Sequence, residues 1–183
     1  MAAEAPAAEI GSPAPEFMLP GTDGAAHSLR GLAGTRGTVV AFICNHCPYV
    51  KAILPRLVRD ARDLLGLGVT VIAINSNDTD AYPEDRFERM VELAPRLSFP
   101  YLYDATQDVA RAYGAVCTPD FFGYDAALHL QYRGRLDASR KETAPEGTTR
   151  DLYEAMRLIA ATGRGPEQQH VCIGCSIKWR ASA

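Results

Sequence analysis

Cys44 and Cys47 lie three residues apart in the stretch FICNHCPYVKAILP, residues 42–55. A cysteine thiolate is a strong nucleophile, and its availability depends on the thiol pKa, which is about 8.5 when free and about 3.5–7.5 at a helix N-terminus. The apolar spacing after Cys47 predicts a helix, whose first turn offers unpaired N–H groups and the positive end of a dipole. We therefore predict that Cys47 is the low-pKa nucleophile.

Other cysteines of the chain offer a second thiol. A thiolate that attacks a disulfide, or that is oxidised to a sulfenic acid, needs such a partner to complete its cycle. Cys44 is the nearest in sequence, Cys117 precedes Pro119 by two residues, and the C-terminal tail carries Cys172 and Cys175. The sequence leaves open whether Cys44, Cys117 or the tail Cys175 resolves the nucleophile.

Two readings without redox chemistry compete with this one. CNHC and HVCIGC together supply four cysteines and two histidines, a ligand set that suits zinc. Paired zinc motifs usually lie much closer in sequence than these two do, so we expect no metal and no cofactor. The remaining alternative is a binding module with buried, inert cysteines. The acidic residues Asp78, Asp80, Glu84 and Asp85 are predicted to be a solvated helix start rather than a cation site.

Composition narrows the class of protein. The 183 residues are 47% apolar and 22% charged, with a net charge of −3 and no cluster of Lys or Arg. Nucleic acids and anionic membranes are therefore poor candidate partners. The apolar runs are too short to span a bilayer, and the N-terminus has neither a basic start nor an apolar run. We expect a cytoplasmic protein, whose thiols are kept reduced.

Apolar runs and amphipathic segments alternate along the chain. Strands are expected over 38–44, 69–77 and 101–104 and as a hairpin over 121–136. Helices are expected over 47–65, 106–114 and 148–163, and a loop followed by a helix over 80–97. This order predicts an α/β fold with a central mixed sheet flanked by helices. The expected organisation is a flexible N-terminal lead over 1–9, one domain over 10–163, and a C-terminal tail over 164–183 with the second CxxC.

Several motifs resemble a known family. GSPAPEFMLPGTDG, the strand FIC, the helix containing Pro55, and AVCTPDFF resemble the redoxin group of the thioredoxin superfamily. That group includes the alkyl hydroperoxide reductase and thiol-specific antioxidant (peroxiredoxin) types and the reductants of cytochrome maturation. The resemblance implies a thioredoxin-like fold with an N-terminal β extension, a cis-proline at Pro119 facing the reactive cysteine, and activity as a thiol-disulfide oxidoreductase or peroxidase with antioxidant activity.

The same resemblance places the individual cysteines. In the cytochrome-maturation reductants the helix proline follows the first cysteine by eight residues, which puts that cysteine at Cys47 when Pro55 is aligned. The second cysteine of their motif falls on Val50. Cys44 takes the place where peroxiredoxins carry a threonine or serine. CNHC is therefore similar to a displaced redox motif with Cys47 as its nucleophile.

The resemblance also implies partners. The substrate would be a disulfide, of a protein or small molecule, or a peroxide, and a thiol such as thioredoxin or glutathione would be the reductant. Relatives of this kind often form dimers, so a homodimer is among the assemblies we expect. Val40 replaces a proline of the peroxiredoxin pattern, and Arg133 or Arg135 is the candidate for its peroxide-binding arginine.

Overall fold

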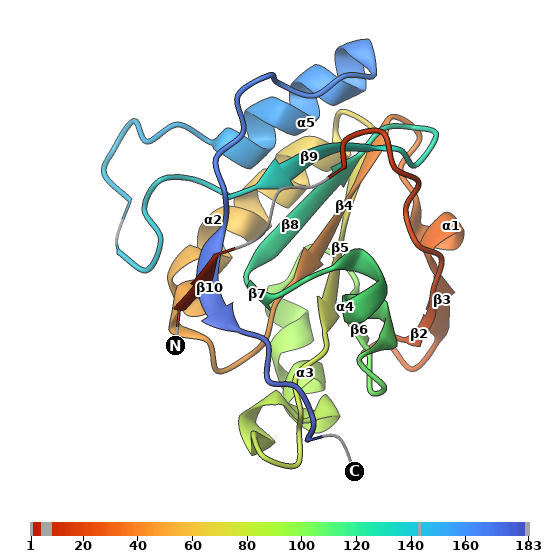
Figure 1. The fold of residues 1–183 in the computed structure, drawn as a ribbon, viewed down its shortest axis with the longest axis vertical. Coiled ribbons are helices and arrows are strands. Elements are labelled where there is room, and N and C mark those ends of the chain that lie inside the picture. The colour runs from red at the N-terminus through yellow and green to blue at the C-terminus, as the bar shows by residue number, and fades with distance from the viewer. Residues whose placement is uncertain (1, 5–8, 143, 182–183) are drawn as a thin grey trace.

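The computed structural model describes residues 2–4, 9–142 and 144–181. Its centre is a five-stranded sheet in the order β6-β5-β4-β8-β9 (Figure 1). The strands are β4 (Gly37–Phe42), β5 (Val69–Asn75), β6 (Tyr101–Tyr103), β8 (Asp120–Tyr124) and β9 (Leu130–Gly134). β4, β5 and β6 are parallel, whereas β8 and β9 are antiparallel to their neighbours. The predicted mixed sheet is confirmed.

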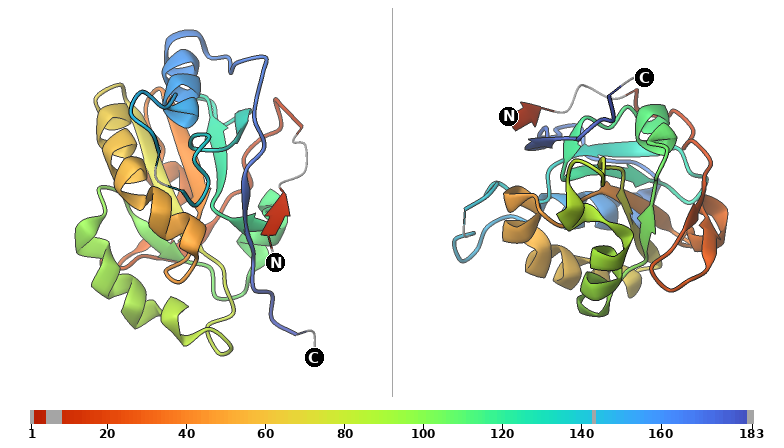
Figure 2. Two further views of the ribbon diagram at one scale, coloured as in Figure 1. Left: turned by 90° about the vertical axis from the view of Figure 1, so that its left-hand side faces the viewer. Right: turned by 90° about the horizontal axis from the view of Figure 1, so that it is seen from below.

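Helices cover both faces of this sheet (Figure 2). They are α1 (Leu29–Leu32), α2 (Pro48–Leu65), α3 (Phe87–Leu93), α4 (Asp108–Tyr113) and α5 (Asp151–Thr162), with short 3-10 helices at Pro83–Asp85 and Ala94–Arg96. One apolar cluster joins the sheet to α2 and α5, and a second lies on the opposite face with α1 and α4. None of the helices in the described part of the chain is long and apolar enough to cross a membrane.

Strand β4 explains why its segment reads as one continuous apolar run. Every residue of β4 is buried, with Val39 and Ala41 in the cluster under α2 and Val40 and Phe42 in the cluster on the other face. Successive side chains of a strand point to opposite faces, so a strand covered on both sides is apolar throughout. β4 ends at Phe42, two residues before Cys44, and the loop that follows carries the cysteine motif.

Both ends of the chain join the fold near this loop. β1 (Ala2–Glu4), β10 (Ile173–Ser176) and β7 (Cys117–Thr118) form a small antiparallel sheet in the order β1-β10-β7. Residues 2–4 are therefore a paired strand, although we expected a flexible lead over 1–9; residues 1 and 5–8 lie outside the described residues. β2 (Met18–Pro20) and β3 (Ala26–Ser28) form the expected N-terminal β hairpin.

Helix boundaries differ from the prediction by a few residues. The helix expected over 106–114 is α4, whose N-cap is Gln107, and the Thr106 hydroxyl accepts a hydrogen bond from the Asp108 N–H at 3.3 Å. Gly114 ends this helix in the left-handed conformation, as expected.

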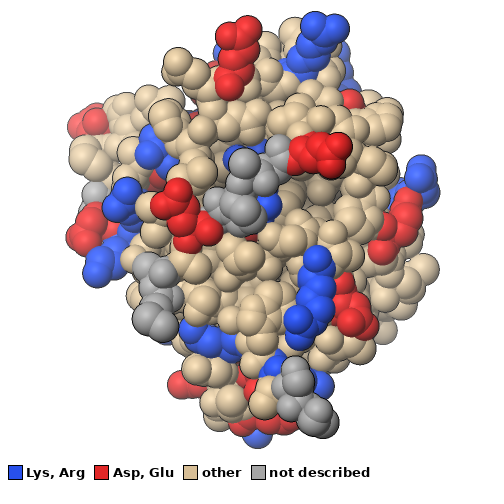
Figure 3. All heavy atoms as spheres, in the orientation of Figure 1, with Lys and Arg blue, Asp and Glu red and all other residues tan. Residues whose placement is uncertain are grey.

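Lys and Arg are intermixed with Asp and Glu on the face seen in Figure 3, which agrees with the absence of a basic cluster in the sequence.

Burial of α2 against the sheet should dominate the stability of this domain. Leu57 lies on the buried side of α2 with no exposed surface, whereas Leu65 near its end is 60% exposed. Leu57→Ala is expected to lower the free energy of unfolding by about 2–5 kcal/mol, because the cavity it leaves cannot close fully. Leu65→Ala is the matched control and should change it by less than about 0.5 kcal/mol. Urea denaturation of the two variants makes the comparison, and equal effects would contradict the described packing.

Candidate active site

Cys47 is the N-cap of α2 and has no exposed surface. Pro48 occupies the first helical position, where its missing N–H costs nothing, so the helix can begin directly after the cysteine. Pro55 lies inside the same helix. The strand-loop-helix arrangement predicted from the sequence thus places Cys47 at the start of α2, where the Val50 N–H acts on its sulfur.

Hydrogen bonds to the Cys47 sulfur lower its pKa to about 5. The largest contribution is the hydrogen bond from the Cys44 thiol, and bonds from Thr118, the Val50 N–H and Cys175 act in the same direction against the effect of burial. When protonated, the Cys47 thiol donates to the Thr118 carbonyl oxygen at 3.1 Å. The sequence pointed to the helix N-terminus as the source of the low pKa, but the Val50 N–H contributes less than Cys44 does.

Cys44 is the opposite member of this pair. Its pKa is raised, first because its proton is engaged with Cys47 and second because the side chain is buried. The Cys44 sulfur also lies 3.5 Å from the Thr118 hydroxyl. One sulfur therefore ionises while the other keeps its proton, which is the behaviour expected of two coupled titrating groups in one site.

A buried carboxylate holds the loop that carries both cysteines. Asp85 Oδ1 accepts hydrogen bonds from the backbone N–H groups of Asn45 (2.8 Å) and His46 (3.1 Å). Its Oδ2 accepts from the His46 ring at 2.5 Å and from the Asn77 amide at 2.8 Å. We expected Asp85 to belong to a solvated acidic helix start, but it has no exposed surface. The burial of Asp85 could not be predicted, because nothing in the local sequence distinguishes it from its exposed neighbour Glu84.

The C-terminal tail crosses this site. β10 runs antiparallel to β7, with Cys175 opposite Thr118 and Ser176 opposite Cys117. The Thr118–Pro119 peptide bond is cis, as the resemblance implied. Gly174 passes so close that an added Cβ would lie 2.1 Å from the Thr118 carbonyl oxygen. The tail therefore packs directly on the segment that contacts the Cys47 sulfur.

Contacts of the residues that follow β10 fix the tail to the body of the domain. The Ile177 N–H donates to the Val116 carbonyl at 2.9 Å, and the Lys178 N–H donates to the Asn77 side chain at 2.9 Å. The Arg111 guanidinium lies over the Trp179 ring, 4.5 Å from the centre of that ring. Backbone pairing thus carries the tail across the end of the central sheet.

The four cysteines other than Cys44 form two groups across this tail. Cys175 belongs with Cys47: burial, followed by the effects of Cys47, raises the pKa of Cys175 to about 11. Cys172 contacts Cys117, which with burial raises the pKa of Cys172 well above its usual value. The thiols of Cys117 and Cys172 both donate to the Pro119 carbonyl oxygen, at 3.5 and 2.9 Å. The tail CxxC is therefore divided between two sulfur groups.

These groups bear on the zinc alternative. We argued against a shared zinc site because the two CxxC motifs lie far apart in sequence. The fold brings the two motifs together, so that argument was wrong. Cys44, His46 and Asp85 place three ligand atoms within 4.8 Å of one another, but the His46 ring and Asp85 are already bonded to each other. Within residues 2–4, 9–142 and 144–181, no such group combines the two motifs.

Neither candidate arginine is among the groups that act on Cys47. Arg133 is buried, pairs with Asp120 at 2.9 Å and lies over the Phe122 ring on the other face of the sheet. Arg135 pairs with Asp151 at 2.6 Å. The expectation that one of them would serve as the peroxide-binding arginine is not supported by these contacts.

Comparison with known proteins adds the following likenesses. The model of the AhpC/TSA family matches residues 10–138. The thiol-disulfide oxidoreductase ResA of Halalkalibacterium halodurans is 32% identical over 107 residues, which are 58% of this chain and 57% of that protein. The chain thus spans little more than half the length of this curated relative.

Two solved structures share the fold. An uncharacterized conserved protein from Geobacillus kaustophilus superposes with a TM-score of 0.94 at 45% identity and covers 100% of this chain and 98% of its own. The thioredoxin domain of a thiol-disulfide oxidoreductase from Bacteroides vulgatus gives a TM-score of 0.59 at 18% identity, with 84% of this chain and 99% of that chain covered. The second likeness shows the thioredoxin-like fold.

Removal of the Cys44 hydrogen bond should raise the pKa of Cys47. A hydrogen bond to a charged group is worth about 1.5–3 kcal/mol, so Cys44→Ala should move the pKa upward by about one to two pH units. Alkylation of wild-type Cys47 should reach half of its maximal rate near pH 5, and Cys44→Ala should reach its half-maximal rate at a higher pH. Cys44→Ser retains a donor and should fall between them. Iodoacetamide alkylation of the Cys47 peptide against pH measures this, and identical midpoints would contradict the role of Cys44.

Displacement of β10 should expose Cys47. Gly174→Ala forces a Cβ against the Thr118 carbonyl oxygen, and such overpacking costs about 1–3 kcal/mol. Opening of the tail, and with it alkylation of Cys47, should then be about tenfold faster, since about 1.4 kcal/mol is a factor of ten. Gly66→Ala is the control, because its nearest neighbour would lie at an ordinary 3.4 Å. An unchanged alkylation rate in Gly174→Ala would show that the tail does not shield the sulfur.

Proposed function

Because the chain belongs to the AhpC/TSA family, we propose that it is a thiol-disulfide oxidoreductase in which Cys47 is the nucleophile and Cys175 the resolving thiol. The observation that carries this proposal is the register of β10 on β7, which sets Cys175 opposite Thr118, the residue whose carbonyl oxygen lies 3.1 Å from the Cys47 sulfur. The low pKa of Cys47 supports the role of nucleophile, since the thiolate is the reactive form.

The proposed cycle has two exchange steps. The Cys47 thiolate attacks one sulfur of a substrate disulfide, forms a mixed disulfide, and releases the other substrate sulfur as a thiolate. Cys175 transfers its proton to that thiolate and attacks the Cys47 sulfur, which forms a Cys47–Cys175 disulfide and releases the rest of the substrate. The substrate gains two electrons and the two cysteines lose them. An external thiol reductant restores both thiols.

The causes of the raised pKa values favour Cys175 over Cys44 as the resolving thiol. The pKa of Cys175 is raised by burial and by the hydrogen bond and the charge of Cys47, while the charge of Lys178 lowers it. The effects of Cys47 vanish once its sulfur is in a mixed disulfide and carries no charge. The pKa of Cys44 would still be raised by its deep burial and by the negative charge of Asp85. Cys175 is therefore the thiol that becomes reactive when it is needed.

Cys117, the third candidate, is less suited to this role. Its recorded contacts are with Pro119 and Cys172, and it is not among the groups that shift the pKa of Cys47. Its side chain is also fully buried. We assign it to the second sulfur group instead.

A disulfide suits this site better than a peroxide. The groups that act on the Cys47 sulfur are thiols, a hydroxyl and a backbone N–H, and no arginine is among them in the described part of the chain. Because Cys47 has no exposed surface, any substrate must displace β10. Once the mixed disulfide has formed, return of β10 to its pairing with β7 brings Cys175 back opposite Thr118 and next to the Cys47 site.

Disulfide mapping tests the proposal. We expect one equivalent of diamide to produce a Cys47–Cys175 link in a Cys172→Ser variant, in which Cys172 cannot take the disulfide onward from Cys175. Peptides from a non-reducing digest, identified by mass spectrometry, report the link. Cys175→Ser in the same background should abolish it, and Cys44→Ser, the matched control, should retain it.

Two results would count against the assignment. A Cys44–Cys47 link as the main product would transfer the resolving role to Cys44. The absence of any disulfide at Cys47, in protein shown to be folded by circular dichroism, would remove the oxidoreductase proposal itself.

A further inference from the structure

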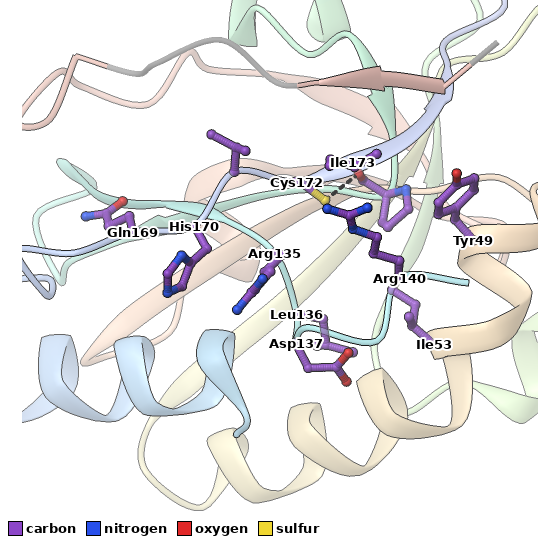
Figure 4. Close-up of a pocket in the computed structure, with 12 residues that line it drawn as sticks. Tyr49, Ile53, Arg135, Leu136, Asp137, Arg140, Gln169, His170, Cys172 and Ile173 are labelled. Atoms are coloured by element: carbon purple, nitrogen blue, oxygen red, sulfur yellow. Dashed lines mark hydrogen bonds between the residues drawn. The ribbon is translucent and has the colours of Figure 1, made fainter. Parts of the chain in front are cut away.

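The second sulfur group borders a cavity that the cycle at Cys47 does not use. The cavity has a volume of about 270 Å³ and lies between the start of α2, the loop after β9 and the segment before β10. Cys172, Arg135, Arg140, His170 and Tyr49 are among its lining residues (Figure 4). Figure 4 shows the Arg140 side chain extending from its loop toward the Cys172 sulfur.

Cationic groups give this cavity a preference for anions. Asp137 is its one lining carboxylate among the described residues, and it is already paired with Arg56 at 2.7 Å. Arg135 uses its Nε on Asp151 at 2.6 Å, and its two terminal nitrogens have no recorded partner among the described residues. Arg140 has no recorded partner within that same part of the chain. Guanidinium groups with free donors bind carboxylates in a bidentate manner.

Size and access favour a small ligand. Pockets for small molecules commonly span about 300–1,000 Å³, so a cavity of about 270 Å³ accepts a compact molecule rather than a folded partner. Arg140 and His170 are exposed and border the cavity, which opens it to solvent. Cys172 is only 2% exposed, so a ligand reaches its sulfur through this cavity.

We propose that this cavity binds a carboxylate-bearing low-molecular-weight thiol or its disulfide, which exchanges with Cys172 and Cys117 as a second redox pair. The geometry supports this pairing, because both thiols donate to the same acceptor, the Pro119 carbonyl oxygen, at 3.5 and 2.9 Å. Cys172 and Cys175, three residues apart along an extended segment, point to different groups and are not a pair in this conformation.

The exchange balances without any further reactant. Cys172, once deprotonated, attacks the disulfide of the oxidised ligand, forms a mixed disulfide and releases one ligand thiolate. Cys117 then attacks the Cys172 sulfur, forms a Cys117–Cys172 disulfide and releases the second ligand thiolate. The two protons lost by the cysteines are taken up by the two ligand thiolates. An excess of ligand thiol reverses both steps.

Glutathione disulfide and its uncharged tetraethyl ester are the probes. Incubation of the reduced protein with glutathione disulfide should give a Cys117–Cys172 link, mapped by mass spectrometry after acid quenching. The ester, which lacks the carboxylates, should form it about tenfold more slowly, because a hydrogen bond to a charged group is worth about 1.5–3 kcal/mol. Arg140→Ala should slow the reaction with glutathione disulfide to the same extent and leave the reaction with the ester unchanged. Arg140→Lys should restore part of the rate.

Controls separate this inference from the cycle at Cys47. Arg62→Ala removes an exposed arginine at the other end of α2 and should change nothing. Cys47→Ser should still form the Cys117–Cys172 link, whereas it abolishes the Cys47–Cys175 link. Cys117→Ser should trap the glutathione adduct on Cys172. The inference is overturned if the adduct forms elsewhere, if no Cys117–Cys172 link appears, or if both probes react at one rate with wild type and Arg140→Ala.

Discussion

The hydrogen bond from the Cys44 thiol to the Cys47 sulfur is the interaction on which the proposed chemistry of this domain depends. It is the largest cause of the low pKa of Cys47, and it works because the same burial and the same proton keep Cys44 neutral. Two thiols that share one proton in a buried site carry a single negative charge, which resides on Cys47, so the two sulfurs differ in ionisation although their environments overlap. The helix N-terminus assists but does not dominate. The strand and the helix are needed because they hold the two sulfurs at this spacing.

Sharing of that proton requires a loop that keeps the two sulfurs close together, and Asp85 holds this loop in place. Each carboxylate oxygen of Asp85 accepts two hydrogen bonds, from donors of Asn45, His46 and Asn77. The carboxylate therefore links the cysteine loop to the segment that follows β5. A buried carboxylate is tolerated only when its hydrogen bonds are complete, as they are here. Thr118 performs the matching task from the other side, where its hydroxyl approaches Cys44 and its carbonyl oxygen approaches Cys47.

Much of this could be predicted from the sequence, and the limits have physical causes. The apolar run ending at Phe42 and the helical spacing after Cys47 are local patterns, so β4, α2 and the N-cap position followed from them. Asp85 could not be recognised, because only the fold shows that its carboxylate faces inward. The tail could not be placed either: β10 binds through backbone hydrogen bonds, and these leave no signature in the residue types of a four-residue strand. The division of the five cysteines depends on that placement.

The pairing of β1 with β10 has a practical consequence for anyone handling this protein. The first and last strands of the described residues are neighbours, and β10 also pairs with the β7 segment that contacts the Cys47 sulfur. An affinity tag or fused reporter attached at either end would therefore pull on, or crowd, the cover of the reactive centre and alter its accessibility. An internal insertion at the hairpin turn of Asp125, Ala126 and Ala127, at the far end of β8, would leave that cover undisturbed.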